Sequence, residues 1–390
     1  MNSLVRILAR SFAVATCAIL AAPGNAAPIH DAARNGDLAA IKTIVAADPG
    51  ALTQRDDDQR TALLVAAYGG HYPVVEFLLA AGSDQTAVDK DGRNALHLAA
   101  QSGVVAIVRH LLDAGFAINT RDNIGATPLL WASASWRKTA HPEGGSSIKY
   151  SYEENISIAR LLLDRGADPR IKHNEIGVTA LHVAAQSGNP HIVTLLLGAA
   201  KDLIDAPSTQ SGTTPLHHAA ARGNGRVLRE DSSSTSYEYL DNLQAARLLI
   251  GAGANVNAVT RDEKSTPLMF AAGFGLSEVT DALIAAGADV SKQNANGQTA
   301  LHLAAATGGR LLQQIVYKGG GGDKVDESGR RYTAQYSLIT TPDNRAAITA
   351  LLLAGADPNI KDRNGRTPLE IARESGNAEN VKAFESFVKK

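Results

Sequence analysis

A short phrase recurs along this chain at a fixed step. Each copy has Thr or Asn, then Ala or Pro, then Leu, and closes on a pair of small residues; the copies begin at Thr61, Asn94, Thr127, Thr179, Thr214, Thr266 and Thr299. Three of the steps between copies are 33 residues. Such a period is typical of stacked helical repeats rather than of a compact enzyme domain. The sequence therefore predicts a repeat array, and says little about which molecule it recognises.

The residues of the phrase predict two helices and a finger in each unit. Thr or Asn caps the first helix, Pro fits its first turn, and a pair such as Ala99 and Ala100 keeps it thin. An apolar run with helical spacing follows, such as residues 107–112, and it ends at a glycine such as Gly115, the expected left-handed C-cap. Asp-Gly or Asn-Gly turns such as Asp91-Gly92 suit a short hairpin-like finger.

These features resemble the ankyrin repeat family. Thr214 to Ala220 reads T-P-L-H-H-A-A and Gly355 to Asn359 reads G-A-D-P-N, close to the signatures of that family, and the likeness covers nearly all of the chain after residue 26. The resemblance implies an all-α ankyrin-repeat solenoid of about ten helix-turn-helix units with short hairpin-like fingers and two inter-helix insertions. We expect the units of this array, residues 27–390, to begin near residues 28, 61, 94, 127, 179, 214, 266, 299, 333 and 367.

The unit at Thr333 is the weakest member of this series. It lacks the usual Leu and Ala pair, and we include it because two steps of 34 residues join Thr299 to Thr367. The alternative is a long insertion that begins near Gly319 to Gly322.

Residues 1–26 read as a signal peptide. Arg6 and Arg10 precede an apolar run over residues 11–22, and small residues lead to a predicted cleavage after Ala26. The alternative is a membrane anchor, but a run of about a dozen residues is short of the roughly 20 that span a bilayer. We therefore expect an exported protein, periplasmic or else secreted, with no membrane span after cleavage. Cys17 is the only cysteine, so the mature chain would have no thiol chemistry.

The sequence gives no support for catalysis, metal binding or nucleic-acid binding. Loss of Arg6 and Arg10 changes the formal net charge from −1 to −3, whereas nucleic-acid binding needs a basic face. One histidine stands at the fourth position of five units, at His30, His97, His182, His217 and His302. They are a whole unit apart and do not converge, and the resemblance implies that they bond backbone between neighbouring units. We expect no catalytic residues, no metal and no cofactor.

Two steps of 52 residues predict insertions at about residues 135–154 and 222–241, between the first and second helices and opposite the fingers. They end alike, with Tyr150 and Tyr152 in one and Tyr237 and Tyr239 in the other. On one interpretation a block of repeats was duplicated with its loop, since loops cost little free energy. On the other, the tyrosines form a bidentate docking surface.

The resemblance also implies where a partner binds: at the finger tips and at exposed first-helix positions after the Ala pair. On this chain these positions are Tyr68, Gln101, Gln186, Arg222 and Phe274 on the helices, with Arg93 and Arg121 at the fingers. Trp131 and Phe270 are expected in the core. The leading hypothesis is a non-catalytic exported scaffold for a protein or peptide partner. The alternatives are an enzyme with carboxylates such as Glu143 and Glu238 in the insertions, or a secreted effector that targets a host protein.

Overall fold

A computed structural model describes residues 27–134, 153–221, 226–231, 234–239, 242–306, 311–325, 331–340 and 344–388, the strands by their backbone alone. The chain divides into two compact units, which we describe separately. Unit 1 holds residues 1–203 and 208–210, and unit 2 holds residues 204–207 and 211–390.

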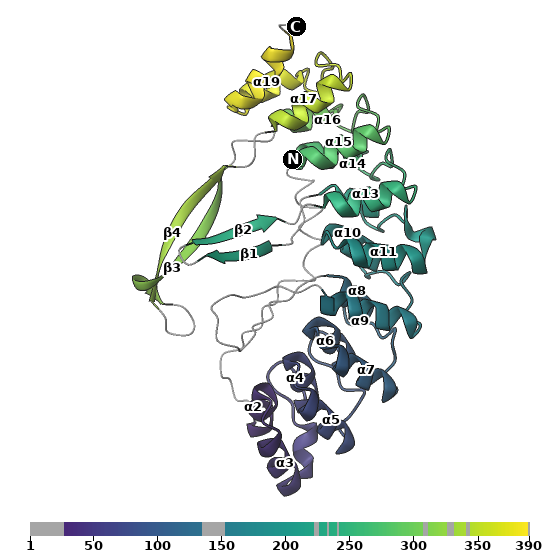
Figure 1. Ribbon diagram of the computed structural model, residues 1–390, viewed down its shortest axis with the longest axis vertical. Coiled ribbons are helices and arrows are strands. Elements are labelled where there is room, and N and C mark those ends of the chain that lie inside the picture. The colour runs from purple at the N-terminus through teal and green to yellow at the C-terminus, as the bar shows by residue number, and fades with distance from the viewer. Residues whose placement is uncertain are drawn as a thin grey trace. The chain divides into compact units, whose positions relative to one another are not determined.

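Unit 1 is a stack of helix pairs that follow one another in chain order (Figure 1). The pairs are α2 (Pro28–Asn35) with α3 (Leu38–Ala47), α4 (Ala62–Gly69) with α5 (Tyr72–Ala80), α6 (Ala95–Ser102) with α7 (Val105–Asp113), α8 (Pro128–Ser133) with α9 (Glu153–Asp164), and α10 (Ala180–Gln186) with α11 (Pro190–Ala199). Two 3₁₀ turns, η1 (Pro49–Thr53) and η2 (Lys201–Leu203), follow α3 and α11.

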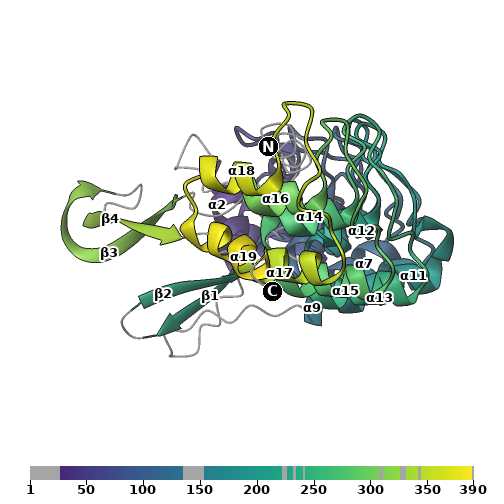
Figure 2. The ribbon, with the colours of Figure 1, turned by 90° about the horizontal axis from the view of Figure 1, so that it is seen from above.

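Unit 2 repeats the same arrangement. Its pairs are α12 (Pro215–Ala219) with α13 (Leu243–Gly251), α14 (Pro267–Phe274) with α15 (Ser277–Ala285), α16 (Ala300–Ala306) with α17 (Arg345–Leu353), and α18 (Pro368–Glu374) with α19 (Ala378–Val388). Seen from above, the first helices α14 and α16 lie between the second helices and the loops of the fingers (Figure 2). The all-α repeat fold predicted from the sequence is confirmed.

The predicted local signals form the helix ends. Asn94 accepts a hydrogen bond from the backbone N–H of His97 at 3.1 Å and caps α6. Gly70 ends α4 at φ +79°, in the left-handed region that favours glycine. The core consists of the apolar stripe of each helix, and Trp131 and Phe270 are buried in it as expected.

The repeated histidines are fully buried, and His30, His97, His217 and His302 bond to the backbone of the next repeat. His97 Nε2 lies 3.1 Å from the carbonyl oxygen of Ala126, and His217 Nε2 lies 3.0 Å from that of Ser265. Burial lowers the pKa of both imidazoles to about 4, despite the opposing effect of these hydrogen bonds. These two rings are therefore neutral at physiological pH and join one repeat to the next, which confirms the structural role.

Four strands lie in the connections within unit 2, and the sequence did not predict them. β1 (Arg226–Asp231) pairs antiparallel with β2 (Ser234–Tyr239), and β3 (Leu311–Val325) pairs antiparallel with β4 (Arg331–Thr340). The prediction that Thr333 begins a helical unit is wrong, because Thr333 lies in β4 opposite Lys318. Tyr332, Thr333 and Tyr336 favour a strand, and the Leu and Ala pair that would bury a first helix is missing.

The α16–α17 connection is therefore a third insertion rather than a repeat. It runs from the end of a first helix to the start of a second helix, as the α8–α9 and α12–α13 connections do. The described residues accordingly form five helix pairs in unit 1 and four in unit 2, instead of about ten.

Candidate partner-binding surface

Backbone hydrogen bonds join the finger tips of each unit into what we call the finger row. In unit 1 the donor and acceptor pairs are Lys90 N to Asp58 O (2.9 Å), Asn123 N to Asp91 O (3.0 Å), Asn174 N to Ile124 O (2.9 Å) and Thr209 N to Ile176 O (3.0 Å). In unit 2 they are Arg261 N to Ser211 O (2.8 Å), Ala295 N to Glu263 O (2.7 Å) and Arg363 N to Asn296 O (3.0 Å). Each tip is thus held in place by its neighbour.

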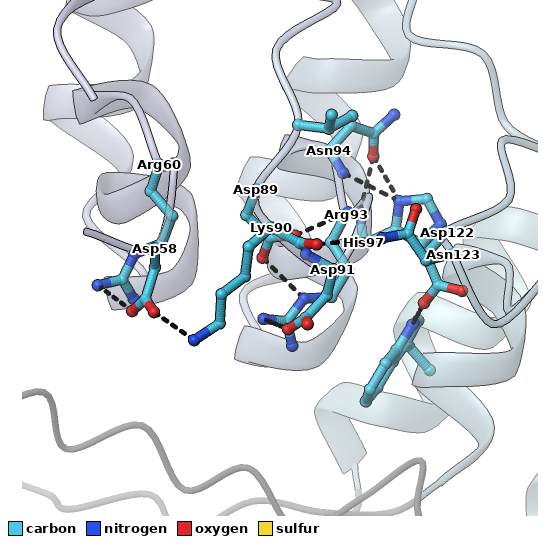
Figure 3. A network of polar contacts seen from close by, with 12 residues as sticks. Asp58, Arg60, Asp89, Lys90, Asp91, Arg93, Asn94, His97, Asp122 and Asn123 are labelled. Carbon is cyan, nitrogen blue, oxygen red and sulfur yellow. Dashed lines mark hydrogen bonds and ion pairs between the residues drawn. The ribbon is translucent and has the colours of Figure 1, made fainter. Parts of the chain in front are cut away.

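A buried aspartate also closes four of the fingers from inside. Asp89 Oδ1 accepts from the backbone N–H groups of Asp91 and Arg93, both at 2.9 Å, and Asp89 Oδ2 accepts from Arg93 Nε at 2.8 Å (Figure 3). The same bonds recur between Asp56 and Arg60 and between Asp362 and Arg366. The sequence signal for this closure is Asp followed four residues later by Arg, and our sequence analysis missed it.

Ion pairs extend the network along the row in unit 1. Lys90 Nζ lies 2.6 Å from Asp58 of the preceding finger, and Asp58 is also 3.0 Å from Arg60 (Figure 3). Arg93 pairs with Asp91 at 2.8 Å. Charges at these tips are therefore largely matched within the molecule.

The fourth finger with a buried aspartate is closed differently. The arginine position is taken by Ala126, and Asp122 Oδ2 accepts instead from the indole Nε1 of Trp131 at 2.9 Å. Burial raises the pKa of Asp122, against the lowering effect of the Trp131 and backbone hydrogen bonds. At Asp56, burial also acts to raise the pKa, but the hydrogen bonds and charge of Arg60 outweigh it and leave the pKa lowered.

The structure corrects two of the predicted binding residues. Arg93 is only 6% exposed, because Asp89 and Asp91 hold its guanidinium group, which also lies 5.8 Å from the ring centre of Trp131. Gln186 is also 6% exposed, because the end of α10 packs on the end of α8, where Ser187 Oγ donates to Ala134 O at 3.2 Å. Neither side chain is open to a partner.

Four of the other predicted residues have side chains that the structure describes. Tyr68, Gln101 and Phe274 are half-buried near the ends of first helices. Arg121 is exposed, and it donates to the carbonyl oxygen of Lys172 at 2.8 Å and to Asn174 Oδ1 at 2.5 Å.

The remaining five predicted residues belong to the first two insertions. Arg222, Tyr150 and Tyr152 lie outside the described residues. For Tyr237 and Tyr239 the structure gives the backbone register of β2, opposite Leu228 and Arg226.

The comparison with protein families agrees with this architecture. The model described as ankyrin repeats (3 copies) matches residues 4–89, 29–122, 70–140, 148–230 and 236–328. The chain belongs to the ankyrin repeat family. Ankyrin repeats generally mediate binding between proteins, and the repeats themselves are binding elements rather than catalytic ones.

Several curated proteins are similar to stretches of this ankyrin array. Ankyrin repeat and SOCS box protein 16 of Homo sapiens is 31% identical over 222 residues, which is 56% of this chain and 37% of that protein. Transient receptor potential cation channel subfamily A member 1 of Homo sapiens is 28% identical over 332 residues, 78% of this chain and 25% of that protein. The chain thus spans well under two thirds of the length of these relatives.

The described parts of the chain contain neither a candidate membrane span nor a candidate metal site. None of the helices described is long and apolar enough to cross a membrane. Nor do the described side chains include a group of three or more His, Cys, Asp or Glu that could hold a metal ion.

Proposed function

We propose that this chain is an exported, non-catalytic ankyrin scaffold that binds a protein or peptide partner through its first-helix ends and finger row. The finger row is the observation that carries the proposal. Its tips are fixed by bonds from one finger to the next, while residues such as Asp57, Asn123 and Glu175 remain exposed on it. A surface ordered before binding loses less conformational entropy when the partner arrives.

The half-buried aromatic side chains strengthen this proposal. Tyr68 at the end of α4 and Phe274 at the end of α14 each offer a large ring with few rotatable bonds. In unit 1, Gln101 occupies the corresponding place on α6 and would add a polar contact. We expect these side chains, and not Arg93 or Gln186, to form the partner-binding residues.

The test is affinity capture from an extract of the native compartment, with the mature chain as bait. We expect the double variant Tyr68→Ala, Gln101→Ala to lose a partner that the unchanged chain retains. Arg109→Ala serves as the matched control, because Arg109 is exposed on the second helix α7. Retention of every captured protein by the double variant would contradict the proposed surface.

Export is the second part of the proposal. The apolar run over residues 11–22 after Arg6 and Arg10 supports it. The periplasm is the compartment we favour. Intact mass measurement of the protein recovered from the periplasmic fraction should give a chain that starts at Ala27, and a full-length chain found in the cytoplasm would oppose export.

The insertions would extend the binding surface through Tyr150, Tyr152, Tyr237 and Tyr239. A variant lacking residues 137–149 and 226–236 separates the two interpretations of these loops. Loss of the captured partner would assign recognition to the insertions, and unchanged capture would assign it to the helices and fingers.

A further inference from the structure

In four repeats without an insertion, one backbone hydrogen bond closes the turn between the two helices. The residue that follows the left-handed glycine donates its N–H to the carbonyl oxygen five residues earlier. The pairs are Asp37 to Ala32 (2.9 Å), His71 to Ala66 (3.0 Å), Asn189 to Ala184 (3.2 Å) and Leu276 to Ala271 (3.0 Å). This bond satisfies a carbonyl of the last helical turn and holds the second helix against the first.

Ala304 of α16 carries the equivalent carbonyl group in the unit with the third insertion. Here the residue before the second helix is Asn344, which the insertion separates from α16 by almost forty positions in the sequence. The Asn344 side chain nevertheless donates its Nδ2 to Ala304 O at 3.0 Å. A side-chain amide thus makes the bond that a backbone amide makes in those four repeats.

The same amide reaches a second helix. Asn344 Nδ2 also donates to Ala272 O, in the last turn of α14, at 3.1 Å. Asn344 is 1% exposed, so both bonds lie away from solvent, where an unsatisfied polar group is costly. Ala304 O also accepts from Asn380 Nδ2 at 3.3 Å, whereas Asn344 alone joins it to α17. One side chain therefore ties the start of α17 to the ends of two successive first helices.

We propose that Asn344 is a clamp that closes the base of the third insertion and keeps α14, α16 and α17 stacked independently of the hairpin β3–β4. Both Asn344 bonds run to first helices, and neither involves a residue of β3 or β4. Asn242 has the same place before α13, after the second insertion, and its Nδ2 donates to Ala221 O at 2.9 Å. A side-chain amide thus joins the start of the second helix to the segment after the first helix at this insertion too, although Ala221 lies two residues beyond the end of α12.

A deletion with a matched substitution tests this clamp. Removing residues 309–343 joins Thr307-Gly308 to Asn344, which restores the length of the α14–α15 turn and puts Gly308 in the place of Gly275. The backbone N–H of Asn344 can then make the bond that Leu276 N–H makes in that turn. The side chain should become dispensable, and Asn344→Leu would simply reproduce the residue found at 276.

Four proteins are compared: the mature chain, Asn344→Leu, the deletion, and the deletion with Asn344→Leu. We expect Asn344→Leu to lower the thermal midpoint by several degrees and to speed hydrogen exchange in the peptides that cover α14 and α16. We expect the same substitution to leave both readouts nearly unchanged in the deletion background. A chain with Asn344→Leu that fails to fold, beside a folded deletion carrying Asn344→Leu, would equally support the clamp.

Three results would overturn the clamp. If Asn344→Leu lowers the thermal midpoint equally in the mature chain and in the deletion, Asn344 acts by packing alone, and this overturns the clamp. No loss in either background, or failure of both variants to fold, would overturn it as well.

Discussion

Trp131 donates its indole N–H to Asp122 Oδ2 at 2.9 Å and so performs the task that an arginine performs in three other fingers. The substituted position is Ala126, four residues after Asp122. The guanidinium group of Arg93, from the finger before, lies 5.8 Å from the Trp131 ring centre. Two successive fingers are thereby joined through one aromatic side chain.

Trp131→Phe should destabilise unit 1 by about 2 kcal/mol, because it removes a donor and leaves the buried carboxylate of Asp122 short of a partner. Urea unfolding followed by circular dichroism measures the loss. Adding Ala126→Arg to Trp131→Phe should recover part of it by rebuilding the aspartate–arginine pair. No recovery, or no loss in the single variant, would show that the indole bond does not close this finger.

Acidification should destabilise the array between about pH 6.5 and pH 4. The pKa of His97 and of His217 is lowered to about 4 by burial, so in this window the unfolded chain takes up protons that the folded chain does not. The contribution of each neutral histidine to the free energy of unfolding is therefore fully present above the unfolded pKa. It is lost as pH falls toward 4, by on the order of 3 kcal/mol per histidine. Thermal midpoints measured from pH 7 to pH 4.5 should decline through this range.

His217→Gln is the control for the pH prediction. It should be less stable than the unchanged chain at pH 7 and should show a shallower decline toward pH 4.5. Asp122 acts in the opposite sense, because its raised pKa favours protonation of the folded state. Parallel curves for the variant and the unchanged chain would rule out His217 as a source of acid sensitivity.

Arg93→Ala should cost stability rather than affinity. The substitution leaves the buried carboxylate of Asp89 without its ion pair, at a cost of about 3 kcal/mol. Tyr68→Ala should do the reverse, with a small change in stability and a loss of partner binding. Unfolding curves and titration with the captured partner separate the two effects, and weaker binding by a fully stable Arg93→Ala protein would contradict this assignment.

Gly177→Ala should be more harmful than Gly365→Ala. Both glycines have positive φ, +66° and +77°, so both substitutions strain the backbone by about 1 kcal/mol. A methyl group at Gly177 would in addition overlap the backbone nitrogen of Thr209 in the next finger, whereas one at Gly365 meets nothing within 4 Å. Equal thermal midpoints for the two variants would show that contact between these fingers does not limit stability.

The repeated phrase was enough to predict the helices, and the family resemblance implied the role of the histidines. His97 and His217 follow from local rules, because each forms its bonds within a few residues or one repeat away. Thr333 shows the limit of the method. A step of 34 residues suggested a repeat there, but the step length carries no information on whether a segment can bury a helix, and the segment forms β4 instead.

The binding residues were harder to predict than the fold. Arg93 and Arg121 look alike in sequence, as basic residues at finger tips, yet Arg93 is buried and Arg121 is exposed. The difference comes from Asp89 and Asp91, which hold the Arg93 guanidinium within its own finger. Spacing alone does not tell which of several nearby partners a long side chain selects.

The sequence by itself determined the family, the helix pairs and their caps, because these depend on interactions that recur within each unit. Only the tertiary structure decided which side chains stay exposed, that Trp131 closes a finger, and that Asn344 joins α14, α16 and α17. The Asn344 contacts link residues far apart in the sequence, since Asn344 lies 72 positions from Ala272. Their formation depends on how the units stack, which is a property of the folded chain and not of any one segment.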